Sequence, residues 1–195
     1  MSAATPARIA SLADIEAAIW SELARAAVDK RHDWRTPVLA SNDGTRPDAR
    51  TVVLREVDVT AHTLVVYSDA RAPKVRQLRI EPRCTFVMWS ARLRWQVRLQ
   101  AIITVHTDGL AATSRWALLR ATPAALDYLA PQAPGELLAP QSPTEPPTAR
   151  AEVAAHREHF AVLSARVEAV DWLSLESGGH RRARFEAGAA QWLAA

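Results

Sequence analysis

The segment YSDARAPKVRQ, residues 67–77, places a lysine where a helix is expected to begin. Tyr67 and Ser68 close an apolar strand, and Pro73 fits the first turn of a helix that also contains Lys74. That turn has free backbone N–H groups and the positive end of the helix dipole, which disfavours a lysine unless an anion lies between them. The pattern predicts a phosphate site. A solvated surface lysine is an equally open alternative.

Two arginines bracket an apolar run upstream, RTVVLR. Arg50 and Arg55 are five residues apart, which puts them on opposite faces of a regular strand. Because an unpaired guanidinium is costly to bury, each is expected to meet an acid or a bound anion. Pairing with Asp48 or Glu56 at an exposed strand end is the alternative, and the residue pattern alone slightly favours it.

Two further combinations could bind a flat ring. Gln96 follows Trp95 in a strongly alternating segment, and a glutamine offers both a donor and an acceptor to the edge of a heterocycle. Trp172 and Arg184, across a predicted hairpin, would supply an apolar surface and a donor fork. A solvated sheet face and a core tryptophan are the default alternatives for these residues.

Other kinds of site find little support. His156 and His159 are three residues apart, but no further His or Cys accompanies them, so no metal is expected. Neither nucleotide-binding glycine motif is present, and the net charge of +3 is spread along the chain, which disfavours nucleic-acid binding. Cys84 is the one cysteine. No run of ~20 apolar residues and no signal-peptide core is found, which predicts a cytoplasmic protein without membrane contact.

The 195 residues are expected to form one domain, residues 1–195, of α+β class with a mainly antiparallel sheet closing toward a barrel. An amphipathic helix is expected at about 11–30 and a Pro-rich loop at 131–147. Strands are predicted at 37–40, 50–57, 64–68, 84–90, 93–105, 167–175, 180–185 and 191–193. Further helices are predicted at 73–81, 110–120, 123–129 and 148–165.

These pieces, in this order, resemble the pyridoxamine 5'-phosphate oxidase-like family of FMN-binding proteins over roughly residues 35–195. The resemblance is carried by RTVVLR at 50–55, YSDARAPK at 67–74, WQVRLQA at 95–101, and Trp172 with HRRARF at 180–185. It implies a split β-barrel with peripheral helices, which forms a homodimer with FMN at the interface. A small-molecule substrate is the other implied partner.

The resemblance also implies roles for individual residues, by position. The resemblance implies that Arg50 and Lys74 contact the FMN phosphate, and that the flavin lies along the strand Arg50, Thr51, Val52, Val53, Leu54 and Arg55. Tyr67 and Ser68 would lie beside the flavin, and Gln96 would contact its isoalloxazine ring. Trp172 and Arg184 would come from the second subunit. The implied substrate contacts are Arg55 and Arg120 at a phosphate, with Arg181 or Arg182 over the ring. No catalytic residue is assigned.

The implied activity is that of an FMN-dependent oxidoreductase, as in pyridoxamine or pyridoxine phosphate oxidation. A hydride would pass from a small substrate to flavin N5, and oxygen would reoxidise the flavin. The alternatives are a flavin reductase, another FMN-dependent oxidoreductase, or a non-catalytic FMN carrier or sensor. The sequence departs from the family pattern at Pro73, Ala101, Trp116 and Ala124, where the oxidases have a basic residue, glycine, tyrosine and serine. These departures predict FMN binding with poor oxidation of pyridoxamine phosphate.

Overall fold

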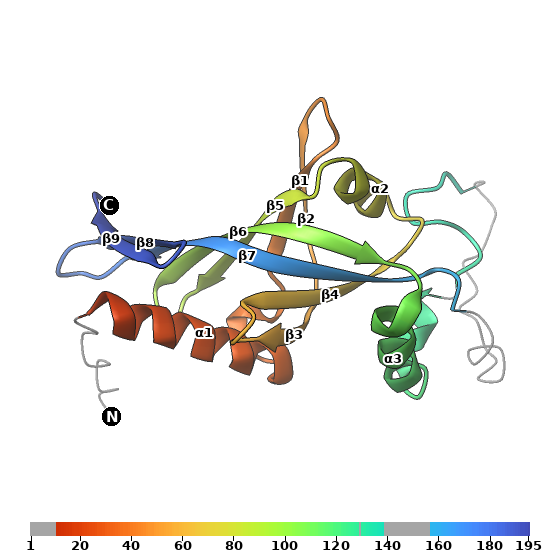
Figure 1. The fold of residues 1–195 in the computed structure, drawn as a ribbon, viewed down its shortest axis with the longest axis horizontal. Helices are drawn as coiled ribbons and strands as arrows, with labels where there is room; N and C mark the ends of the chain where they lie inside the picture. The colour runs from red at the N-terminus through yellow and green to blue at the C-terminus, as the bar shows by residue number, and fades with distance from the viewer. Residues whose placement is uncertain (1–10, 129, 139–156) are drawn as a thin grey trace.

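An antiparallel sheet forms the frame of the molecule, with helices packed at its sides and ends (Figure 1). The computed structural model describes residues 11–128, 130–138 and 157–195. The helical elements are α1 (Leu12–Val28), η1 (Asp33–Arg35), α2 (Pro73–Ile80), α3 (Gly109–Leu119) and η2 (Pro123–Tyr128). The strands are β1 (Val38–Asn42), β2 (Pro47–Thr51), β3 (Leu54–Asp58), β4 (Thr63–Asp69), β5 (Arg83–Ser90), β6 (Trp95–His106), β7 (Phe160–Ser174), β8 (Arg181–Glu186) and β9 (Ala189–Leu193). The α+β class with a mainly antiparallel sheet is therefore confirmed.

The strand order shows how the sheet curls without closing. The hydrogen-bonded path runs β2-β1-β5-β6-β7-β4-β3, and β8 and β9 extend from β7. The long β7 makes this branching possible, because its first half pairs with β4 and its second half with β8. The two ends of the path, β2 and β3, are joined through Val52 and Val53 rather than by ladder hydrogen bonds.

The predicted single strand at 50–57 is therefore wrong. Residues 47–51 pair with β1, whereas residues 54–58 pair with β4 at the other end of the path. Between them, the Val52 N–H donates to the Pro37 carbonyl at 2.9 Å. The apolar run continues through this change of partner, so the residue pattern alone does not reveal where one strand ends and the next begins.

The predicted helix at 148–165 is wrong where the structure describes it. Residues 160–165 begin β7, between β4 and β6, and the side chains from Phe160 to Leu163 are all fully buried. A continuous apolar run is compatible with a buried helix or a central strand, and here the two neighbouring strands decide the outcome. Residues 148–156 lie outside the described residues. Of the predicted Pro-rich loop, residues 131–138 contain no helix or strand, and 139–147 are not described.

Helix α1 confirms the expected N-terminal helix. The Ser11 hydroxyl accepts a hydrogen bond from the Asp14 N–H, as the sequence predicts for a capped start. Ile15, Ile19 and Leu23 share one face and are fully buried in the main core, which lies between α1 and the sheet. A second, smaller core cluster lies beneath α3 and η2. In the described part of the chain, no helix is long and apolar enough to cross a membrane.

Candidate functional site

Arg50, on β2, is held by β1 and α2. Its Nη1 donates to the Leu39 carbonyl at 3.2 Å and to the Ser41 hydroxyl at 2.8 Å. Its Nη2 donates to Asp48 Oδ2 at 2.5 Å and to Gln77 Oε1 at 3.0 Å. The alternative predicted from the sequence, a pair with Asp48, is thus present, but it is one part of a larger network.

Lys74 lies beside this network, in the first turn of α2. Burial, followed by the nearby charge of Arg50, lowers the pKa of Lys74, and Asp69 partly opposes the shift. Within the described residues, its ammonium makes no hydrogen bond or salt bridge. The N-cap residue Ala72 provides no side-chain cap, so the first-turn N–H groups also lack a side-chain acceptor from that position. The two cations implied at a phosphate are therefore brought together, and one of them has no counterion among the residues described.

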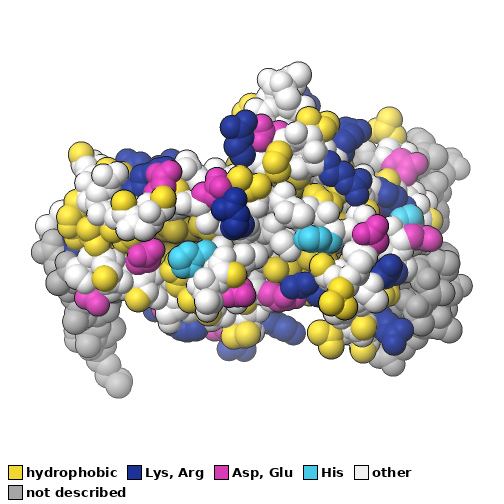
Figure 2. Space-filling view, viewed as in Figure 1, with side chains coloured by type: hydrophobic (Ala, Val, Ile, Leu, Met, Phe, Trp, Pro, Cys, Tyr) yellow, Lys and Arg dark blue, Asp and Glu magenta, His cyan; other side chains and the backbone are white. Residues whose placement is uncertain are grey.

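The surface around α2 is also basic. The helix carries Arg76 and Arg79 in addition to Lys74, and no acid. Figure 2 shows Lys and Arg side chains gathered where α2 lies in this view. The local potential therefore favours an anionic ligand.

The stretch from Thr51 to Leu54 carries the chain from one end of the sheet path to the other. Thr51 is exposed and Val53 is partly exposed, whereas Val52 and Leu54 are buried in the main core. Arg55 follows on β3, so the two arginines that bracket the run belong to different strands.

Glu56, on β3, joins Tyr67 of β4 to Arg115 of α3. The Tyr67 hydroxyl donates to Glu56 Oε1 at 2.8 Å, and Arg115 donates to both carboxylate oxygens at 2.8 and 2.7 Å. Burial, and then the hydrogen bond to Glu56, raises the pKa of Tyr67 well above its ordinary value. Arg55 lies over the Tyr67 ring, 5.5 Å from its centroid. The buried Nε of Arg55 has no hydrogen-bond partner in the part of the chain that is described.

The sequence predicted a substrate contact for Arg120 and no role for Arg115. Arg120 is exposed at the C-cap of α3, and its side chain makes no hydrogen bond or salt bridge with a described residue. The only signal for Arg115 in the sequence is its place on the predicted helix at 110–120, which does not indicate the contact with Glu56.

Ser68 and Tyr67 face opposite sides of β4. Ser68 is buried, and its hydroxyl donates to the Asp69 carbonyl at 3.2 Å. Asp69 in turn accepts from Arg71, which also donates to the carbonyls of residues 130–132. The loop before α2 is thereby tied to the segment that follows η2.

Gln96 lies on the face of β6 that is opposite to the core. On the same face, Asp171 of β7 accepts from Arg98 Nη2 at 2.6 Å and from Arg182 Nη2 at 2.8 Å. Burial alone would raise the pKa of Asp171, but the hydrogen bonds from Arg182 and Arg98 outweigh it and lower the pKa. Arg184, which is paired with Asp171 in the ladder, lies on this face too.

Trp172 and Arg184 are not brought together within one chain. Trp172 is paired with Ala183, is 1% exposed, and faces the core. Arg184 is paired with the preceding residue, Asp171, and so faces the other side. Arg181 shares the face of Trp172, with its guanidinium 5.6 Å from the ring centroid. Arg182 shares the face of Arg184.

Arg50 and Arg184 also lie on opposite faces of the sheet. A row of paired residues runs from Arg50 across the core side of the sheet, through Leu39, Phe86, Leu99, Val170 and Phe185. Arg184 precedes Phe185 and therefore projects from the other face, as Gln96 does. Within one chain, the implied phosphate ligands and these two implied ring ligands are separated by the sheet.

Two residues that differ from the family pattern at the implied substrate site, Trp116 and Ala124, lie in the second core cluster. Trp116 is 4% exposed, and its ring centroid is 5.3 Å from that of Phe160. Ala124 is partly buried and packs against the same cluster. Neither position offers a hydroxyl group to a ligand.

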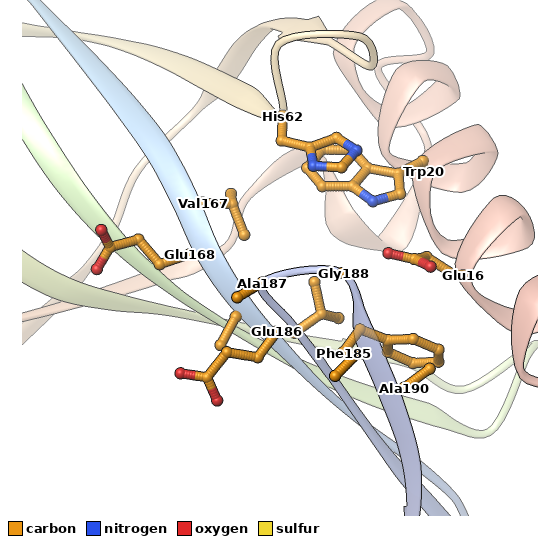
Figure 3. A pocket seen from close by; sticks show the side chains of 13 residues that line it. Glu16, Trp20, His62, Val167, Glu168, Phe185, Glu186, Ala187, Gly188 and Ala190 are labelled. Atoms are coloured by element: carbon orange, nitrogen blue, oxygen red, sulfur yellow. The ribbon is translucent and has the colours of Figure 1, made fainter.

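A separate cavity of about 150 Å³ lies between α1, β7 and the β8–β9 hairpin (Figure 3). Trp20 and His62 are stacked at one wall, with ring centroids 4.4 Å apart, and the Glu16 side chain lies next to them. None of the residues implied to bind cofactor or substrate lines this cavity. It is therefore not part of the candidate site.

Metal binding gains no support from the described residues, which contain no group of three His, Cys, Asp or Glu suited to an ion. Of the histidine pair noted in the sequence, His156 lies outside the described residues. Cys84 is buried, and burial raises its pKa to about 12, so its thiol stays protonated at neutral pH.

The sequence matches one family model. Residues 17–107 match the FMN-binding domain of pyridoxamine 5'-phosphate oxidase. This span runs from within α1 to the end of β6 and contains Arg50, Lys74 and Gln96. A comparison with curated proteins finds no match.

Solved structures extend the similarity to nearly the whole chain. A pyridoxamine 5'-phosphate oxidase-related, FMN-binding protein from Nostoc punctiforme is 21% identical, with 100% of both chains covered and a TM-score of 0.68. PhzG from Burkholderia lata, in complex with tetrahydrophenazine-1-carboxylic acid, is 14% identical, with 98% of this chain and 99% of that chain covered and a TM-score of 0.72. A heme binding protein from Mycobacterium smegmatis is 20% identical, with 84% of this chain and 57% of that chain covered and a TM-score of 0.50.

At these identities the solved structures establish the fold, and the expected split-barrel class is confirmed. The protein is similar in sequence over residues 17–107 to the FMN-binding domain of pyridoxamine 5'-phosphate oxidase, and in fold over nearly the whole chain to a pyridoxamine 5'-phosphate oxidase-related, FMN-binding protein.

Proposed function

We propose that the protein binds FMN and acts as an FMN-dependent oxidoreductase. The observation that carries this proposal is the pair Arg50 and Lys74, whose like charges lie close together at the start of α2. Two neighbouring cations, one without a counterion among the described residues, are stabilised by an anion that contacts both. The residues present therefore fit the phosphate end of FMN.

In this proposal, the ring of FMN is contacted by residues of a second subunit. Gln96 and Arg184 project from the face of the sheet opposite to Arg50. In the proposed homodimer, Arg50 and Lys74 of one subunit bind the phosphate, while Gln96 and Arg184 of the other subunit contact the ring. Trp172, buried beneath Arg181, would support that surface from the core side.

Bound FMN would supply a hydride acceptor that oxygen can regenerate. Arg55 would orient the substrate, because its guanidinium lies over Tyr67 and its Nε has no partner among the described residues. Arg115, by contrast, is already neutralised by Glu56. PhzG holds tetrahydrophenazine-1-carboxylic acid, which supports a cyclic substrate with one carboxylate as the class to test first.

The test begins with the purified protein. Its visible spectrum is recorded, the bound flavin is released, and chromatography separates FMN from FAD. Substrates are then added, and hydrogen peroxide is measured. A protein that holds FAD, that holds heme, or that takes up no flavin on reconstitution would contradict the proposal. Bound FMN without turnover across cyclic carboxylates and pyridoxine phosphates would favour the carrier or sensor alternative.

A further inference from the structure

Gln77, one turn after Lys74 on α2, is the buried centre of the Arg50 network. Its side-chain carbonyl accepts from the Ser41 hydroxyl at 2.7 Å and from Arg50 Nη2 at 3.0 Å. Its amide group donates to Asp48 Oδ2 at 2.9 Å. The residue is 7% exposed, so these bonds are shielded from water and each is costly to lose.

We propose that Gln77 is a positioning residue that aligns Arg50 for the phosphate group of FMN. The inference rests on the proposed function, because it assigns Gln77 a role in the same phosphate site. Lys74 and Gln77 are three residues apart and share one face of α2. One helix thereby supplies one cation directly and fixes the second cation through a hydrogen bond.

The network engages every N–H group of the Arg50 guanidinium except one. Nη1 has two acceptors and Nη2 has two acceptors, so the four terminal N–H groups are all engaged. The Nε–H group is the one donor that makes no hydrogen bond to a described residue. Arg50 therefore has a fixed orientation and one unused donor, and it lies beside the ammonium of Lys74. A pre-oriented donor loses less entropy on binding than a mobile one.

A glutamine is the side chain that this position requires. The carboxamide must accept on one side, from Ser41 and Arg50, and donate on the other side, to Asp48. A glutamate would place a second carboxylate 2.9 Å from Asp48 and would oppose the phosphate. A methionine has a similar length but would leave Arg50, Ser41 and Asp48 each without one hydrogen bond.

The test compares FMN with riboflavin, which lacks the phosphate group. Dissociation constants are measured by flavin fluorescence for the wild type, Gln77→Met and, as a matched control on the exposed surface, Gln132→Met. We expect Gln77→Met to raise the Kd for FMN about tenfold or more, the effect of weakening a hydrogen bond to a charged group. The Kd for riboflavin should not change, and Gln132→Met should bind both flavins as the wild type does.

A second variant, Gln77→Glu, adds a signature that a purely structural role would not give. At pH 8 the ionised glutamate should weaken FMN binding more than the methionine does. Asp48 raises the pKa of this glutamate, whereas Arg50, 3.0 Å from the Gln77 carbonyl oxygen, and the Lys74 ammonium lower it. The comparison is therefore extended to about pH 4, below the ordinary pKa of a glutamate, where the protonated form is expected. A protonated glutamate can donate to Asp48 and accept from Ser41 and Arg50, as Gln77 does, so the ratio of its FMN Kd to that of the wild type should fall toward one.

Three outcomes would overturn the inference. An unchanged FMN Kd in Gln77→Met would show that Arg50 needs no alignment. Equal losses for FMN and riboflavin, or a Gln77→Glu deficit that does not depend on pH, would assign Gln77 to folding alone. If the wild type itself binds no FMN, the proposed function fails first, and that result is distinguishable because it does not depend on any variant.

Discussion

Lys74 and Lys30 are the only lysines in the sequence, and they provide a matched pair for testing the phosphate site. Lys74 is partly buried beside Arg50, whereas Lys30 is exposed after the end of α1. We expect Lys74→Ala to weaken FMN binding by ~1.5–3 kcal/mol, the range for a hydrogen bond to a charged group. Isothermal titration calorimetry of the apoprotein with FMN gives the value.

Lys30→Ala is the control for that measurement. It removes the same charge from the protein but not from the site, so the FMN affinity should stay within experimental error. Equal losses from both variants would indicate a general electrostatic effect in place of a defined phosphate ligand.

The prediction that pyridoxamine phosphate is a poor substrate depends on two side chains. Trp116 and Ala124, where the oxidases have a tyrosine and a serine, are packed in the second core cluster and offer no hydroxyl group. Two lost hydrogen bonds to a phosphate, at ~1.5–3 kcal/mol each, would weaken pyridoxamine phosphate binding by ~10²–10⁴-fold. Steady-state peroxide assays should therefore find little or no oxidation of pyridoxamine and pyridoxine phosphates. A kcat/KM of ~10⁴ M⁻¹s⁻¹ or more would show that this expectation is wrong.

At the level of the strands, Asp171 links the second half of β7 to β6 through Arg98 and to β8 through Arg182. The carboxylate is 7% exposed, but the two arginines are 42% and 33% exposed and can be partly solvated without it. We therefore expect Asp171→Asn to lower the free energy of unfolding at pH 7 by about 1–2 kcal/mol. Urea denaturation at a fixed protein concentration measures the change, and Asp127→Asn, at an exposed site, is the control.

The same variant has a predictable pH dependence. The hydrogen bonds from Arg182 and Arg98 lower the pKa of Asp171 from its ordinary value of 3.8 in spite of burial. A carboxylate with a depressed pKa stabilises the fold above pH 3.8 and loses that contribution as the pH falls through the lower folded-state value. The difference between wild type and Asp171→Asn should therefore shrink below about pH 4. A difference that grows on acidification would contradict the assigned charge state.

The sequence pattern predicted the helices and strands that are determined by residues close to one another in the chain. The alternation from Leu93 to Val105 became β6, and the capped start at Ser11 became α1. The change of partner at Val52 was not predictable, because it depends on which strands lie at the two ends of the sheet path. The contact between Arg115 and Glu56 was missed for the same reason: it joins α3 to β3 across 59 residues. Local spacing carries no information about such a contact.

The sheet that runs through the protein divides the implied flavin ligands into two sets. Arg50 begins the row of paired residues that continues through Leu39 and reaches Phe185 on β8. Arg184 and Gln96 project from the other face. We therefore expect a flavin that contacts both sets to lie at a subunit interface, and we predict that the protein is a homodimer at concentrations where it holds FMN.

Co-expression of two differently tagged variants tests this shared site. Arg50→Ala/Lys74→Ala lacks the phosphate ligands, and Arg184→Ala lacks one ring ligand; Trp172 is left intact, because its loss would open a cavity in the core. Each homodimer should bind FMN poorly, whereas each mixed dimer should contain one intact site and one doubly defective site. In a random mixture, roughly a quarter of all sites should regain normal affinity. If each site were built within one chain, every site in a mixed dimer would keep its defect, and no recovery would be seen. A monomer by light scattering that still binds FMN tightly would likewise refute the shared site.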